Sequence, residues 1–191
     1  MLSGRICAFC LAVVSVFSFL SACADMRTAN ESLFGKYAAP LKPDPGEFAQ
    51  ATEAWRWLVP ATAEPLLMTA LGDVFVRLND GTIMFLDTES GEFMRVAPTM
   101  EEWQNLLRRP EYVERWFRPK FVAKLQEQHQ PLQSPYVYSP TIPLILNGER
   151  TPQNYTPSRW DAHLHVMGQI HRQVKDLPAG TPITKIHVEP W

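Results

Sequence analysis

Cysteine is scarce in this sequence and confined to its start. The 191 residues include three cysteines, which are Cys7, Cys10 and Cys23. The rest of the chain therefore has neither a disulfide nor a thiol nucleophile, so packing must supply its stability. Cys7 and Cys10 have the spacing of a redox or zinc motif, but they lie in an apolar run, and we interpret that spacing as a coincidence.

The chain also lacks an excess of positive charge. Its formal net charge is -2 and its pI is near 6.2. Basic residues cluster at one place, but acidic residues surround them: Arg115, Arg118, Lys120 and Lys124 stand among Glu111, Glu114 and Glu127. This pattern predicts a solvated helix face and no nucleic-acid partner.

The usual catalytic signatures are missing as well. The sequence has no G-x-S-x-G, H-E-x-x-H, G-x-x-x-x-G-K or G-x-G-x-x-G. No spacing of carboxylates singles out an acid and base pair. The motifs therefore point to no particular reaction and to no cofactor, while carboxylates that are distant in the sequence stay open as an acid and base pair.

The N-terminus has the pattern of an export signal. Arg5 precedes an uncharged run from Ile6 to Ala22, and small residues follow it. Leu20-Ser21-Ala22-Cys23 resembles the lipobox of bacterial lipoproteins, which implies cleavage after residue 22 and attachment of diacylglycerol to Cys23. Two or more acyl chains would anchor the protein stably. Ala24, and not Asp, follows the cysteine. This resembles the sorting signal of lipoproteins that are sent to the outer membrane, where the protein would face the periplasm.

An alternative cleavage stays open. Ala22-Cys23-Ala24 also fits the A-x-A pattern of ordinary secretory cleavage, which would release a soluble periplasmic protein. In either case we expect a Pro-containing tether over residues 23–50 and one domain over residues 51–191. The spacing of apolar residues over Glu47–Leu58 favours a short helix at this boundary.

The strongest structural signal lies between Gly72 and Pro98. Alternating apolar residues predict strands over Val74–Leu78, Thr82–Leu86 and Phe93–Val96. Tight turns at Asn79-Asp80-Gly81 and at Thr88–Gly91 join these strands into a meander. Because turns are exposed, we consider Asn79, Asp80 and Glu89 candidate partner contacts.

Helical spacing follows the meander. Thr99 is a candidate N-cap with Glu102 three residues later, and prolines divide the following residues into three short helices. Pro131–Pro157 predicts a long ordered connection with a short strand. Ser158 is a candidate N-cap for a helix over Trp160–Val174, and Ile183–Val188 predicts a final strand. The fold class is therefore α+β, with a mainly antiparallel sheet, a central three-strand meander and helices packed on one side.

The histidines of the last helix do not form a metal site. His163 and His165 point in different directions, while His163 and His171 are about 12 Å apart along the axis. His163 and His171 lie on the apolar face of this helix and are expected to be partly buried with hydrogen-bond partners. That face is formed by Trp160, Leu164, Met167, Ile170 and Val174. Asp161 and His165, at i and i+4, can pair on the outer face, where both are candidate partner contacts.

Several short motifs resemble, in this order, the C-terminal domain of type VI secretion immunity proteins, whose plan is similar to that of SUKH-type immunity proteins. They are Ala70–Val76, Asp80-Gly81, Phe85-Leu86-Asp87 with Gly91, Gly148-Glu149 with Asn154, Gly168–His171, and Leu177-Pro178 with Gly180-Thr181. The resemblance covers about residues 55–189. Asn147 departs from it, because a second glycine is expected there.

The resemblance implies a non-enzymatic protein that binds and blocks a cognate secreted toxin. Because the export signal directs this chain to the envelope, we expect the toxin to act there. The competing hypotheses are an envelope lipoprotein of the same fold with a housekeeping role, and a hydrolase-type enzyme that uses Asp161, His165 or distant carboxylates.

Overall fold

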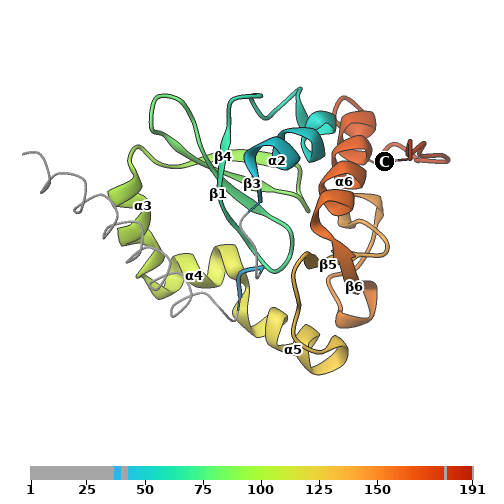
Figure 1. The fold of residues 1–191 in the computed structure, drawn as a ribbon. Helices are drawn as coiled ribbons and strands as arrows, with labels where there is room; N and C mark the ends of the chain where they lie inside the picture. Colours follow the sequence, from blue (N-terminus) through green and yellow to red (C-terminus); the bar gives the residue numbers. More distant parts are fainter. Residues whose placement is uncertain (1–36, 40–42, 179, 191) are drawn as a thin grey trace, which may run out of the picture. The chain divides into compact units, whose positions relative to one another are not determined.

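A four-stranded antiparallel meander forms the main sheet. The computed structural model describes residues 37–39, 43–178 and 180–190, so the export signal, Cys23 and much of the predicted tether lie outside the described residues. The strands are β1 (Glu64–Met68), β2 (Val74–Arg77), β3 (Ile83–Asp87) and β4 (Glu92–Ala97), paired in that order (Figure 1). Gly81 and Gly91 turn the chain between strands with φ values of 87° and 73°. The predicted meander is confirmed, and β1 extends it by one edge strand.

Helices cover both faces of this sheet. The Phe75 ring lies 5.3 Å from the ring of Trp103 in α3 (Met100–Leu107) and 5.3 Å from that of Trp116 in α4 (Pro110–Phe117). Because neighbouring strand residues point to opposite faces, Val74 and Val76 face away from these helices. There they join the core under α2 (Pro45–Ala51) and α6 (Trp160–Val174).

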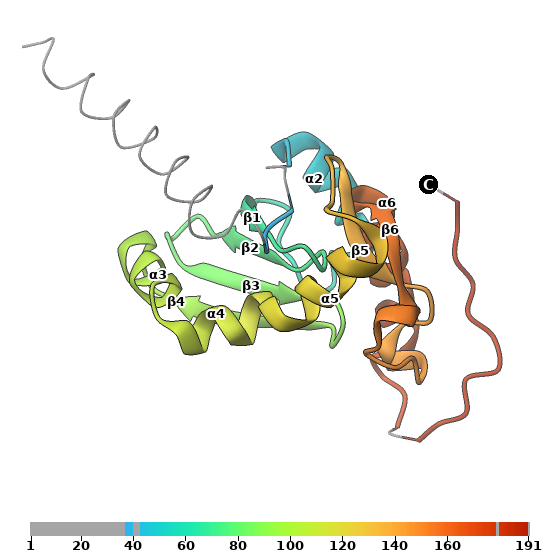
Figure 2. The same cartoon turned by 90° about the horizontal axis from the view of Figure 1, so that it is seen from below.

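Figure 2 shows α3, α4 and α5 (Pro119–His129) on one side of the sheet and α2 on the other. The α+β class with its mainly antiparallel sheet is confirmed, whereas the expectation of helices on one side is wrong. The helix boundaries agree with the sequence pattern, since Thr99 Oγ1 accepts a hydrogen bond from Glu102 N and prolines begin α4 and α5.

The long connection contains a second, two-stranded sheet. It consists of β5 (Tyr136–Pro140) and β6 (Tyr155–Arg159), with 3-10 turns η2 (Leu144–Leu146) and η3 (Pro152–Asn154) between them. The connection is ordered, as predicted. Ser158 belongs to β6, so the predicted N-cap is wrong, and Arg159 precedes α6 without a side-chain cap.

The packed domain begins before residue 51. Ala39 N donates to Met68 O and Ala70 N donates to Tyr37 O, so residues 37–39 pair beside β1. Asp44 caps α2 through the N–H groups of Gly46 and Glu47. Because Phe48 of α2 is buried in the core, the last part of the predicted tether belongs to the domain.

The C-terminal segment differs from its sequence-based prediction. Residues 181–190 have no regular secondary structure, so the predicted strand Ile183–Val188 is wrong. No helix within the described residues has both the length and the apolar character needed to cross a membrane.

Candidate functional site

Arg118 lies at the centre of a buried cluster of ion pairs. It joins α4 to α5 in a left-handed conformation, with φ 46°. Its Nη1 lies 3.4 Å from Asp73 Oδ2 and 3.2 Å from Glu89 Oε2, and its Nη2 lies 3.2 Å from Asp87 Oδ2. The prediction that Arg118 belongs to a solvated helix face is therefore wrong.

The cluster holds more acidic than basic groups. Arg150 adds a second cation, with Nε 3.1 Å from Glu89 Oε2, and the Tyr155 hydroxyl donates to Glu89 Oε1. Burial and the nearby charge of Asp87 raise the pKa of Asp73 to about 7, although Arg118 opposes this shift. A protonated Asp73 brings the cluster closer to electrical balance, since two guanidinium groups then face two carboxylates.

His163 and His171 connect α6 to this cluster through Thr88. His163 Nε2 lies 3.0 Å from Thr88 Oγ1 and its Nδ1 lies 2.8 Å from Ser139 Oγ, while His171 Nε2 lies 3.0 Å from Thr88 O. The Thr88 hydroxyl in turn donates to Asp73 Oδ1 at 2.9 Å. Burial lowers the pKa of His163 to about 4 and also lowers the pKa of His171. The expected burial and hydrogen bonding of both histidines are confirmed.

Two glycines allow α6 to approach the meander this closely. A β-carbon on Gly72 would lie 2.4 Å from His163 Nε2, and one on Gly91 would lie 2.4 Å from His171 Nδ1. The cluster therefore connects the meander, the α4–α5 junction and α6. Its charged side chains form ion pairs with one another, and none of them lines the groove at the C-terminal segment or the cavity at His165.

The described residues contain no group of three histidine, cysteine or acidic side chains that could hold a metal ion. His163 points into the cluster, whereas His165 Nε2 lies 3.2 Å from the backbone oxygen of Glu189 in the C-terminal segment. The structure thus separates the two histidines of the H-x-H pattern, as the helix geometry predicts.

The loop over residues 141–154 is fixed by its own hydrogen bonds. The Asn154 side chain accepts from Ile142 N at 2.9 Å and donates to Ile142 O at 2.8 Å and Glu149 O at 2.9 Å. A β-carbon on Gly148 would lie 1.9 Å from Ile142 O, so the loop can adopt this conformation only with a glycine at position 148. Asn147 has φ 66°, a left-handed conformation that asparagine tolerates, which explains how it replaces the expected glycine.

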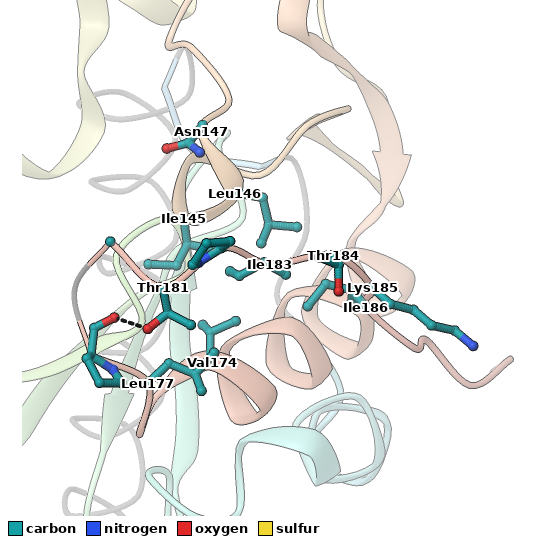
Figure 3. A pocket seen from close by; sticks show the side chains of 13 residues that line it. Ile145, Leu146, Asn147, Val174, Leu177, Thr181, Ile183, Thr184, Lys185 and Ile186 are labelled. Carbon is teal, nitrogen blue, oxygen red and sulfur yellow. Dashed lines mark hydrogen bonds between the residues drawn. The ribbon is translucent and has the colours of Figure 1, made fainter.

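This fixed loop exposes apolar side chains beside a groove. Ile142 and Ile145 are 54% and 40% exposed, and Leu177 and Ile183 are 45% and 37% exposed. Figure 3 shows the groove, a cavity of about 430 Å³ between the loop, the end of α6 and the C-terminal segment. The labelled side chains comprise six apolar ones and four polar ones: Ile145, Leu146, Val174, Leu177, Ile183 and Ile186, and Asn147, Thr181, Thr184 and Lys185. Exposed apolar side chains on an ordered loop are typical of a protein-binding surface.

The structure does not place Asp161 and His165 in one cavity. Asp161 Oδ2 lies 2.7 Å from Nη2 of Arg159. Burial raises the pKa of Asp161, but the hydrogen bonds from Arg159 and from the backbone N–H of Ala162 outweigh it and hold the pKa below its usual range. His165 lines a second cavity of about 520 Å³ with Ala49, Gln50, Glu53, Arg56 and Pro190, and Asp161 is not among these residues.

The other predicted contact residues lie at the two turns of the meander. Asn79 and Asp80 are exposed, and Asp80 Oδ1 accepts a hydrogen bond from Thr82 N. Glu89 is 3% exposed and belongs to the ion-pair cluster, so its expected exposure is wrong. The two turns lie at opposite ends of β3, so these residues do not form one surface.

Sequence reasoning missed the cations of the cluster. Arg118 and Arg150 reach carboxylates 45 and 61 positions away in the chain, and no local spacing signals such contacts. The sequence does contain a signal for Asp73. This residue lies between Gly72 and the apolar strand that begins at Val74, where a carboxyl group is unusual.

Comparison with known proteins finds one family. Residues 97–171 match the family model described as "T6SS immunity protein Tdi1, C-terminal". No curated protein matches the chain. The crystal structure of Atu4351 from Agrobacterium tumefaciens is similar with a TM-score of 0.45 and 16% identity, covering 65% of this chain. The chain spans 62% of that protein's length. The matched segment runs from the end of β4 into α6.

Proposed function

We propose that this chain is an exported, lipid-anchored bacterial immunity protein that binds and neutralises a toxin acting in the cell envelope. The family match over residues 97–171 supports the immunity role. The apolar run from Ile6 to Ala22 and the lipobox-like residues before Cys23 support export and lipid attachment. An envelope location of the immunity protein requires a toxin that acts on wall, membrane or other envelope components.

The observation that carries this proposal is the fixed apolar loop inside the matched segment. Ile142 and Ile145 are exposed, while Asn154 and Gly148 determine the loop's conformation. A loop ordered before binding loses little conformational entropy when a partner covers it. A cavity of about 430 Å³ lined by both apolar and polar side chains suits the insertion of one or two partner side chains.

The buried cluster supports a role other than catalysis. Its carboxyl and imidazole groups are bound to Arg118, Thr88 and one another, away from the groove. The hydrolase alternative has less support, because Asp161 pairs with Arg159 and is not among the residues that line the cavity at His165.

Capture of the toxin tests the binding role. The full chain, purified from its native envelope, is mixed with the tagged product of the adjacent gene, and the complex is quantified. Ile142→Asp and Ile145→Asp should each lower the affinity at least about tenfold, because a carboxylate would be buried against an apolar partner. Tyr136→Ser is the matched control, since Tyr136 is 41% exposed in β5. Failure to bind that product or any secreted effector would contradict the proposal.

Intact-mass measurement tests the lipid anchor separately. The mature protein should begin at Cys23 and carry the mass of a diacylglycerol and a further acyl chain. A Cys23→Ser variant should lose that mass and leave the membrane fraction. An unmodified wild-type chain that begins at Asp25 would instead support ordinary secretory cleavage and a soluble periplasmic protein.

A further inference from the structure

Two glutamines of α6 hold the C-terminal segment by its backbone. Gln173 Oε1 accepts from His187 N at 3.1 Å, and Gln173 Nε2 donates to His187 O at 2.7 Å. Gln169 repeats this pattern with Glu189, at 2.7 Å to its N–H and 3.2 Å to its oxygen. Each side-chain amide thus binds one residue of the segment as a neighbouring β-strand would.

The spacing of these contacts defines the conformation of the segment. Helix residues four apart rise by about 6 Å, and strand residues two apart advance by about 6.7 Å. The two distances agree only if the segment is extended. It runs antiparallel to α6, because the later residue, Glu189, pairs with the earlier glutamine, Gln169.

The opposite edge of this extended segment is unpaired. Since successive residues of an extended chain direct their amide groups to opposite sides, those of Ile186 and Val188 point away from α6. Within the described part of the chain, no backbone-to-backbone hydrogen bond involves residues 182–190. The segment between Pro182 and Pro190 is rich in β-branched residues, which favours strand pairing.

The side chains of the segment are complementary to those of an identical segment. Lys185 and Glu189 are exposed, and neither forms an ion pair with another described residue. In an antiparallel pair centred on His187, Lys185 of each copy lies opposite Glu189 of the other. The same register places Ile186 opposite Val188, and these are the residues whose amide groups point outward.

We propose that the segment Ile183–Glu189 pairs antiparallel with the same segment of a second copy of this chain, with His187 at the two-fold axis. The Ile186–Val188 pair then occurs twice and exchanges both of its backbone hydrogen bonds each time. Pro182 and Pro190 limit the pairing to this short stretch, because proline has no N–H to donate. The interface is small, so the dimer is weak and depends on concentration.

Sedimentation equilibrium of the full chain in density-matched detergent tests the dimer. The average mass should rise toward twice the monomer mass between about 10 µM and 1 mM. Lys185→Glu should keep the protein monomeric in this range, because it places like charges opposite each other in both cross-strand pairs. The double variant Lys185→Glu/Glu189→Lys restores opposite charges and should dimerise like the wild type.

Neither variant removes the contacts of Gln169 and Gln173, because these bind the backbone of residues 187 and 189. A change in the average mass therefore reports on dimerisation and not on unfolding of the segment. A wild-type chain that stays monomeric at the highest concentration would overturn the proposal. A dimer that is unaffected by Lys185→Glu would overturn it equally.

A cysteine at the two-fold axis gives an independent test of the register. His187→Cys should form a disulfide between copies under mild oxidation, because residues facing each other at the axis have β-carbons about 5 Å apart. Thr184→Cys, which faces Pro190 of the other copy, is the control and should add no cross-link to the baseline of the parent chain. Equal cross-linking by the two variants would contradict the register.

Discussion

A β-carbon on Gly91 would lie 2.4 Å from Nδ1 of His171. The turn between β3 and β4 therefore touches α6 with no side chain between them. Thr88 of the same turn accepts a hydrogen bond from His171 Nε2, so one short segment is fixed to the helix by both packing and hydrogen bonding. This contact joins the meander to the segment that matches the immunity family.

Alanine at Gly91 should destabilise the fold more than alanine at Gly81. Both glycines have positive φ, but a β-carbon on Gly81 meets nothing within 4 Å. Gly81→Ala should cost about 1–2 kcal/mol from backbone strain alone. Gly91→Ala should cost about 1–3 kcal/mol more, because the His171 ring must move. Urea denaturation of both variants measures the difference, and equal losses would show that the contact with His171 is unimportant.

Local sequence patterns predicted the helices and turns of this fold well, but they did not predict the tertiary contacts of each element. The turn glycines, the Thr99 cap and the prolines that begin α4 and α5 act over a few residues, so the sequence reveals them. Ile183–Val188 has strand character, but a strand also needs a partner edge, which tertiary structure decides. Here, α6 supplies glutamine side chains instead. Arg118 was misassigned for the same reason, since its partners are distant in sequence.

Removal of the Arg118 charge should be strongly destabilising. Arg118→Met keeps much of the alkyl chain but leaves Asp73, Asp87 and Glu89 close together without their shared cation. The loss should be about 3–5 kcal/mol in the free energy of unfolding, the usual cost of breaking a buried ion pair. Arg109→Met is the control, because its partner Glu111 is exposed, and it should cost less than about 1 kcal/mol. Similar midpoints of denaturation for the two variants would refute the importance of the cluster.

Asn154 should control the order of the groove loop. Asn154→Ala removes the contacts to Ile142 and Glu149, and we expect a loss of about 1–3 kcal/mol together with faster hydrogen exchange across residues 141–150. The neighbouring Gln153→Ala is the control, because Gln153 is exposed. If the loop is the toxin-binding surface, Asn154→Ala should also weaken binding, since disorder adds an entropic cost. Unchanged exchange in the loop would contradict the assigned role of Asn154.

Asp73 and His163 should give opposite pH dependences of stability. Burial and Asp87 raise the pKa of Asp73 from an ordinary value of 3.8 to about 7. Its contribution to stability is therefore fully present below about pH 4 and is lost as the pH rises through 7. Burial lowers the pKa of His163 from 6.5 to about 4. Its contribution is present above about pH 6.5 and is lost as the pH falls through 4.

The two slopes oppose each other over the same range, and single variants should separate them. Between about pH 4.5 and 6.5, the fall that Asp73 causes should offset the rise that His163 causes, so that the upward contribution of His171 remains in the wild type. Asp73→Asn removes the acid, so stability should then rise with pH because His163 and His171 remain. His163→Gln should have the lower slope of the two variants, because the fall that Asp73 causes is then opposed by His171 alone. Urea denaturation across this range measures the slopes, whatever the overall stability of each variant. Equal slopes in the two variants would mean that Asp73 and His163, which both hydrogen-bond to Thr88, do not have opposite effects on the pH dependence of stability.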